Sequence, residues 1–162
     1  MELSPQERAL CVEVEFSEEV ALSLKNATGN AVEQAFCYDD ELEAQPFAAL
    51  SSVWTNEQAR LEELRALLPE PYCAFWGIRR KPNGLEIGRE LVVLHDAEPM
   101  AFVRCRRPDG ANYHLSHEMV LARLEEWHAR LGVSIRGADH DQVEFEFERL
   151  PDDVMALVEE IY

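Results

Sequence analysis

Hydrophobic and polar residues alternate most regularly at residues 142–148, and this period of two predicts a strand with one apolar and one acidic face. Val143, Phe145 and Phe147 should cover a core, while the glutamates between them face solvent. Residues 9–16 alternate in the same way and predict a half-buried strand. Further strands are expected at residues 31–40, 71–80, 85–96, 100–107 and 133–138.

A helical period of 3.6 residues appears in several other segments. Ser17 should cap a short helix that ends near Gly29, and Ser116 should cap a longer one that ends at Gly132. Pro151, followed by two aspartates, is typical of the start of a last helix. The buried faces expected for these three helices are Val20 and Leu24; Val120, Leu124, Trp127 and Leu131; and Val154, Leu157, Val158 and Ile161.

Residues 55–68 predict one more helix, because Thr55 and Gln58 have capping-box spacing and three leucines follow on one face. Asn83 and the glycine after it favour a hairpin turn between two strands. Gly88, inside the returning strand, suggests a bulge.

These elements predict one α+β domain over residues 1–162: a mostly antiparallel sheet with helices packed on one face. Residues 71–107 should form three consecutive strands in a meander, and residues 41–52 should form a connection. An apolar share of 47% provides enough material for one sizeable core.

Net charge changes the functional picture more than any motif does. The chain has 32 acidic and 15 basic residues and a formal charge of −17. Such a field repels phosphate, so we expect no nucleic-acid or anionic-membrane partner. It favours a basic protein partner, or serves solubility alone. Arginines gathered at residues 79–80 and 104–107 pair with neighbouring glutamates or mark a homodimer contact.

The chain carries no pattern of a secreted or membrane-spanning protein. No apolar stretch approaches the ~18–20 residues that cross a bilayer, and the first residues lack a signal-peptide pattern. We therefore expect a cytoplasmic protein. Its cysteines, Cys11, Cys37, Cys73 and Cys105, are too far apart for metal knuckles or redox motifs, so four free thiols and no disulfide are expected.

The densest group of polar side chains is PDGANYHLSHE, residues 108–118. Its proline, aspartate and glycine are typical of a turn, and Ser116 begins the next helix. His114 and His117 could chelate a metal only from one helix face, and no third ligand is evident. We expect a turn with His117 exposed, and neither a metal nor a cofactor.

Residues 110–162 resemble the bacterial family known as domain of unknown function 4253, whereas residues 1–100 do not align with it. The family pattern has a Gly-x-Asn-Tyr turn, a helix with a tryptophan, a Gly-Ala-x-x-Asp segment, a Leu-Pro pair and a helix reading Glu-Ile-Tyr. The matching positions here are Gly110, Asn112, Tyr113, Trp127, Gly137, Ala138, Asp141, Leu150, Pro151, Glu160, Ile161 and Tyr162. The resemblance implies no activity.

Two kinds of functional site remain. The first is a row of carboxylates that could bind a cationic protein surface, or that is simply a solvated face: Asp139, Asp141, Glu144, Glu146 and Glu148. The second is an enzyme site of unknown reaction, for which Cys105, His114, Asn112 and Asp109 are the candidates. Nucleotide and hydrolase motifs are missing, so no catalytic residue is assigned.

The leading hypothesis is a non-enzymatic acidic interaction domain, such as a bacterial immunity or inhibitor protein for a basic toxin. The alternatives are an enzyme of unknown reaction and a regulatory subunit of a larger assembly.

Overall fold

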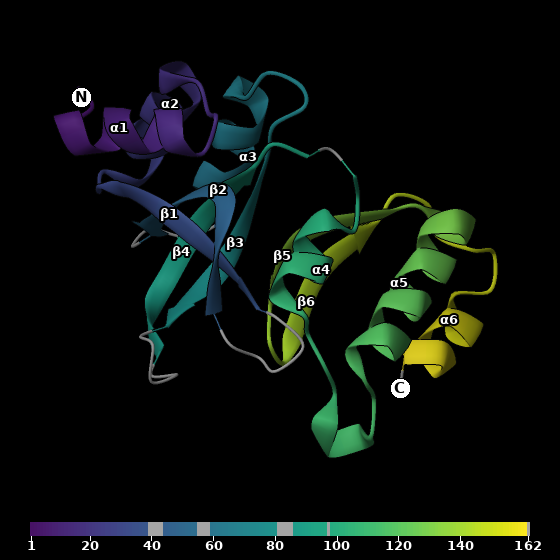
Figure 1. The fold of residues 1–162 in the computed structure, drawn as a ribbon. Coiled ribbons are helices and arrows are strands. Elements are labelled where there is room, and N and C mark those ends of the chain that lie inside the picture. Colours follow the sequence, from purple (N-terminus) through teal and green to yellow (C-terminus); the bar gives the residue numbers. More distant parts are fainter. Residues whose placement is uncertain (39–43, 55–58, 81–85, 97, 162) are drawn as a thin grey trace.

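A six-stranded sheet organises the chain, in the order β1-β2-β4-β3-β5-β6 (Figure 1). The computed structural model describes residues 1–38, 44–54, 59–80, 86–96 and 98–161. Within these ranges, neighbouring strands are antiparallel except for β3 and β5, which are parallel. The strands are β1 (Val32–Tyr38), β2 (Ala44–Trp54), β3 (Cys73–Arg80), β4 (Glu86–Leu94), β5 (Val133–Asp139) and β6 (Gln142–Phe147). The α+β class is therefore confirmed.

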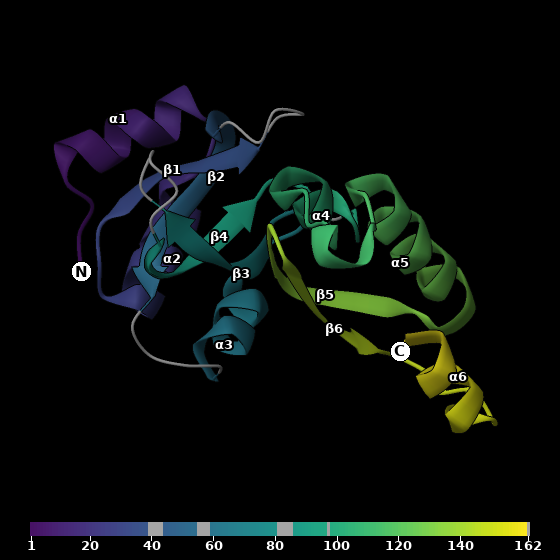
Figure 2. The ribbon, with the colours of Figure 1, turned by 90° about the horizontal axis from the view of Figure 1, so that it is seen from below.

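Helices cover both faces of this sheet, so the expectation of helices on one face is wrong. Helices α1, α2 and α3 pack on one face of the sheet, and helices α4 and α5 pack on the other (Figures 1 and 2). Leu91, Val92, Val93 and Leu94 show why, because this run has no polar residue and all four side chains are buried. The helices are α1 (Pro5–Glu13), α2 (Glu18–Thr28), α3 (Ala59–Leu67), α4 (Ala101–Arg106), α5 (His117–Leu131) and α6 (Val154–Ile161).

Several boundaries follow the sequence signals closely. The Ser17 side chain accepts a hydrogen bond from the Val20 amide, and α2 ends at Gly29 in the left-handed region. Ser116 caps α5 in the same way. The pairing of β3 with β4 shifts register beside Gly88, as expected of a bulge. Thr55, Gln58, Asn83 and Gly84 lie outside the described residues.

Three segments differ from the prediction. Residues 5–13 form helix α1 and not a strand, and residues 44–54 form strand β2 and not a connection. Residues 101–106 form helix α4, so β3 and β4 make a hairpin without a third consecutive strand.

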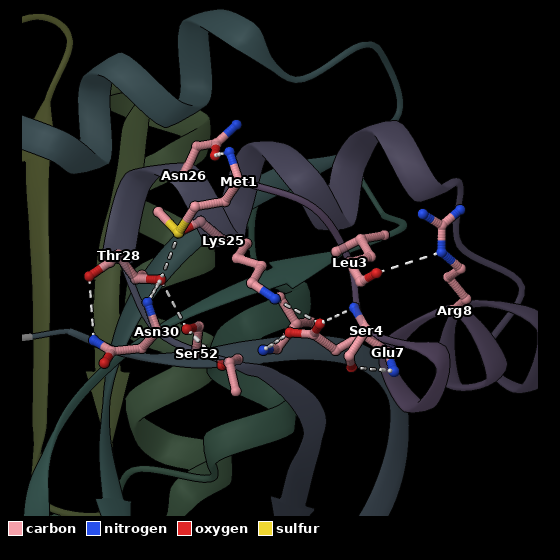
Figure 3. A network of polar contacts seen from close by, with 12 residues as sticks. Met1, Leu3, Ser4, Glu7, Arg8, Lys25, Asn26, Thr28, Asn30 and Ser52 are labelled. Atoms are coloured by element: carbon pink, nitrogen blue, oxygen red, sulfur yellow. Dashed lines mark hydrogen bonds and ion pairs between the residues drawn. The ribbon is translucent and has the colours of Figure 1, made fainter.

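A buried carboxylate joins α1 to α2 and β1 (Figure 3). The Ser4 and Val32 amides donate to Glu7, whose carboxylate also lies 2.6 Å from Lys25 Nζ. Burial alone would raise the pKa of Glu7, but the Lys25 ammonium and these backbone donors lower it to about 2. Nearby, the Thr28 hydroxyl lies 2.8 Å from that of Ser52. The Glu7 contacts fix α1 to α2 and β1, and the Thr28–Ser52 contact fixes α2 to β2.

A disulfide joins Cys37 on β1 to Cys105 on α4, so the prediction of four free thiols is wrong. Cys11 and Cys73 are free. The two bonded residues are 68 positions apart, and their approach depends on α4 packing beside the edge strand β1. Neither the spacing of the cysteines nor the local sequence pattern around them predicted that α4 packs beside β1.

Candidate functional site

The two main motif segments of the resemblance meet at one end of the β5–β6 hairpin. The Asp109 amide donates to the His140 carbonyl at 2.8 Å, which joins the turn at residues 108–114 to the hairpin tip. Asp139 and Gln142 are paired across the tip, with Asp141 in the turn between them. The structure therefore joins the turn that carries Gly110, Asn112 and Tyr113 to the hairpin tip that carries Asp141, a link that the separate sequence segments could not have indicated.

His140 is held between two carboxylates at this tip. Its Nδ1 lies 2.9 Å from Asp139 Oδ2 and 3.5 Å from Asp141 Oδ1. Asp139 is fully buried, whereas the imidazole is about half exposed. One ligand atom from each of these three residues lies within 4.8 Å of the others, a spacing that a cation could use. Sequence reasoning missed His140, although its position between two aspartates was a readable signal.

Tyr113, in the turn at residues 108–114, exposes 80% of its surface. Gly110 allows close packing, because the Leu115 side chain lies against its α-carbon. The Asp109 carboxylate accepts a hydrogen bond from the Ala111 amide and so shapes the turn. His114 closes a 3₁₀ turn, η1 (Ala111–Tyr113), with a positive φ of 57°.

The two histidines of this stretch have different surroundings. His117 is buried, and its Nδ1 lies 3.2 Å from the Pro108 carbonyl, so the prediction that it is exposed is wrong. His114 is exposed. The pair therefore does not present two nitrogens on one exposed helix face.

The candidate enzyme site loses its nucleophile in this structure. Cys105 is bonded to Cys37, so its sulfur has no thiolate to attack a substrate while the disulfide is intact. Cys105 also lies in a helix and not in the expected strand. Asn112, His114 and Asp109 stay on the exposed turn without it.

The carboxylate row is only partly available to a partner. Asp139 is buried, which removes it from any docking surface. Glu144 and Glu146 contact Arg136, at 3.8 Å and 3.1 Å, and Arg136 also pairs with Glu62. Asp141 and Glu148 are exposed.

The other face of β6 packs as predicted. Phe145 and Phe147 both contact the Trp127 ring, with centroids 5.8 Å apart in each case. Trp127 Nε1 donates to Glu160, whose carboxylate also pairs with Arg130. Hydrogen bonds from Arg130 and then Trp127 lower the pKa of Glu160 below its usual value. The motif residues Trp127 and Glu160 thus attach α6 to α5.

Helix α6 differs from the expected packing. Of the four residues assigned to its buried face, Leu157 is buried, but Val154, Val158 and Ile161 are not. Met155 and Leu150 are also exposed, and α6 lies at the periphery beside α5 (Figure 1). We call these five exposed residues the α6 face: Leu150, Val154, Met155, Val158 and Ile161.

None of the helices in the described ranges combines the length and the apolar character needed to cross a membrane. Comparison with curated proteins and with solved structures finds no match. A family model does match: residues 90–162, from the middle of β4 through α6, match the domain of unknown function DUF4253, which confirms the resemblance found in the sequence. The match begins before residue 100, so the expectation that residues 1–100 do not align is wrong for residues 90–100.

Proposed function

We propose that this protein is a non-enzymatic interaction domain that binds a basic protein through the α6 face. The observation that carries the proposal is the exposure of five large apolar residues on one short helix and its lead-in, at 37–67% of their surfaces. Single exposed apolar residues are ordinary, but a contiguous group on a soluble domain is typical of an interaction surface.

Exposed acidic residues lie on the same helix and just before it. Asp152 and Asp153 precede α6, and the exposed Glu159 lies on the helix itself. With a net charge of −17, the whole domain would attract a basic partner over a long range, while the apolar group would supply the buried centre of the interface. This combination favours a basic partner with an apolar patch of its own.

The partner class that fits this charge best is a basic toxin, and the protein would then be a bacterial immunity or inhibitor protein. Enzymes that act on nucleic acid are basic because they bind phosphate, so an acidic inhibitor is steered onto them. A regulatory role in a larger assembly would use the same surface. The cytoplasmic location expected from the sequence stays a prediction, because disulfides such as Cys37–Cys105 are uncommon in reducing compartments.

A matched pair of substitutions tests the proposal. Val158→Asp places a charge in the α6 face, and Val12→Asp makes the same change on α1, where Val12 is 81% exposed. Each variant is used to capture partners from extracts of the native organism, after circular dichroism has shown that it is folded. We expect a basic protein that binds wild type and Val12→Asp but not Val158→Asp.

The association kinetics of the captured protein provide the second readout. Association should be fast at low salt and slow as salt rises, because exposed charges act over about 8 Å at physiological ionic strength. Asp152→Asn with Asp153→Asn should lower the association rate more than the dissociation rate changes. A partner that binds both valine variants equally, or self-association through the α6 face in sedimentation experiments, would overturn the proposal.

A further inference from the structure

The sheet has a seam between β3 and β5. Trp76 and Gly137 are the single residue pair in register between these two strands in the described part of the chain. Two residues before this pair on each strand, the side chain of Arg65 in α3 takes the place of backbone hydrogen bonds between the strands. Its Nε donates to the Ala74 carbonyl at 2.8 Å and its Nη2 donates to the Ile135 carbonyl at 2.6 Å. The Arg65 side chain therefore bridges β3 and β5 beside the Trp76–Gly137 pair.

A cavity of about 330 Å³ lies at this seam. Phe75 and Ile135 are among its apolar walls, and Cys73, His128 and Glu148 are among its polar groups. That size and mixture are typical of sites for small ligands.

Glu148 is held in place at the cavity by backbone contacts. Its amide donates to the Gly132 carbonyl at 3.1 Å, and its side chain lies against the Gly132 α-carbon, where a Cβ would fall 2.5 Å from Oε2. The neighbouring Arg149 turns its guanidinium to the Arg130 carbonyl instead. Among the residues that the structure describes, no cation pairs with the Glu148 carboxylate.

Arg65, the arginine that lines the cavity, already has hydrogen-bond and ion-pair partners. Arg65 uses two nitrogens on carbonyl oxygens, and its Nη1 lies 3.5 Å from Glu62. His128 Nδ1 is likewise occupied by backbone groups, since it lies 3.0 Å from the Val133 amide nitrogen and 3.1 Å from the Val133 carbonyl oxygen. The unpaired charge at the cavity is thus the carboxylate, in a domain whose net charge is −17.

We infer that this cavity binds a small organic cation, an ammonium group on a compact apolar body. The ammonium pairs with Glu148, and the body packs against Phe75 and Ile135. This site is separate from the α6 face and does not depend on the proposed function.

The free thiol of Cys73 reports directly on the cavity, because Cys73 lines it and the other free thiol, Cys11, is buried. Native protein is treated with two methanethiosulfonate reagents, one carrying trimethylammonium and one carrying sulfonate. In each reaction the thiolate displaces methanesulfinate and forms a mixed disulfide. Burial raises the pKa of the Cys73 thiol and slows both reactions, but the ratio of the two rates removes this effect.

We expect the cationic reagent to label Cys73 faster, relative to a free thiol in solution. Glu148→Gln should lower the ratio of the two rates about tenfold, as expected for one unit charge acting oppositely on the two reagents. Glu13→Gln removes the same charge from the exposed end of α1 and should leave the ratio within about twofold. Equal effects of the two substitutions would overturn the inference.

Protection experiments test the ligand class. Phenethylammonium should slow the labelling of Cys73 by a neutral alkylating reagent, and phenylacetate, its anionic counterpart, should not. Ser134→Leu, which fills the cavity from β5, should abolish protection even if Glu148→Gln fails to fold. Protection by phenylacetate alone, or by neither probe, would contradict the inference.

Discussion

Trp76 lies with its indole directly on the α-carbon of Gly137, so that a Cβ on residue 137 would fall 2.3 Å from the ring. These two residues are also the registered pair that joins β3 to β5. The glycine is therefore needed for close approach and not for an unusual backbone angle. It links the four-stranded part of the sheet to the hairpin that follows α5 (Figure 2).

Gly137→Ala should destabilise the protein by about 1–3 kcal/mol, because the added methyl overpacks a filled contact. Urea denaturation monitored by tryptophan fluorescence measures the change. Trp76→Leu relieves the clash, so the loss in the Trp76→Leu/Gly137→Ala double variant should be smaller than the sum of the single losses. Additive losses would show that the indole is not what excludes the alanine.

Glu7 makes stability depend on pH. Its pKa is lowered from its usual 4.5 to about 2 in the folded state, so its contribution is complete above about pH 4.5 and is lost as the pH falls toward 2. A shift of this size corresponds to about 3 kcal/mol. Glu7→Gln should remove that contribution at pH 7 and flatten the acid limb of the stability curve. Urea midpoints between pH 2 and 7 test this, and an unchanged acid limb would count against it.

Helix α1 was predicted as a strand although the sequence before it carries a helix-start signal. Ser4, Pro5 and Glu7 make a capping box with proline at the first helical position, which is a strong helix start. The alternation over residues 9–16 favoured a strand instead. In α1, Cys11 is buried while Val12 points to solvent, so the apolar residues follow a helical and not a two-residue period.

Other differences depend on tertiary contacts that no local pattern contains. Four of the six residues of α4 are buried, so neither a helical nor a strand period is visible there. Ser52 on β2 is buried, but its hydroxyl is satisfied by Thr28 and by the Ala31 carbonyl. Likewise, Val154, Val158 and Ile161 of α6 were expected to be buried, and they are exposed. The sequence could not show which apolar helix positions another element covers.

The disulfide gives a simple thiol count. Denatured, unreduced protein should show two reactive thiols, Cys11 and Cys73, and reduction should raise the count to four. Replacing Cys37 and Cys105 with serine should lower stability by about 4 kcal/mol, since the bond closes a loop across 68 residues. Four thiols before reduction would contradict the Cys37–Cys105 bond.

The two sides of α6 should respond differently to truncation. Leu157→Ala should cost about 3 kcal/mol, because Leu157 is buried. Met155→Ala should change stability by no more than about 0.5 kcal/mol, since 67% of its surface is exposed. Thermal or urea denaturation of the two variants distinguishes these outcomes. An equally large loss for Met155→Ala would mean that the α6 face is part of the core and not a docking surface.

Arg106 and Glu90 form a buried ion pair between α4 and β4, at the point where the DUF4253 match begins. The guanidinium also lies over the Phe102 ring, 5.2 Å from its centre, and against the α-carbon of Gly77. Arg106 Nε has no hydrogen-bond partner among the described residues, so this charge depends heavily on the single carboxylate. Removing that carboxylate leaves a cation in the interior.

Glu90→Leu should therefore destabilise the protein by about 3–5 kcal/mol, and Arg106→Met should do the same by leaving the carboxylate unpaired. Replacing both residues, as Glu90→Leu/Arg106→Met, should recover most of the loss, because apolar side chains need no desolvation of charge. Urea denaturation of the three variants provides the cycle, with Glu13→Gln as an exposed control. If the double variant is as unstable as the sum of the single ones, the pair does not act as a unit, and α4 is held to the sheet by its apolar contacts and the disulfide alone.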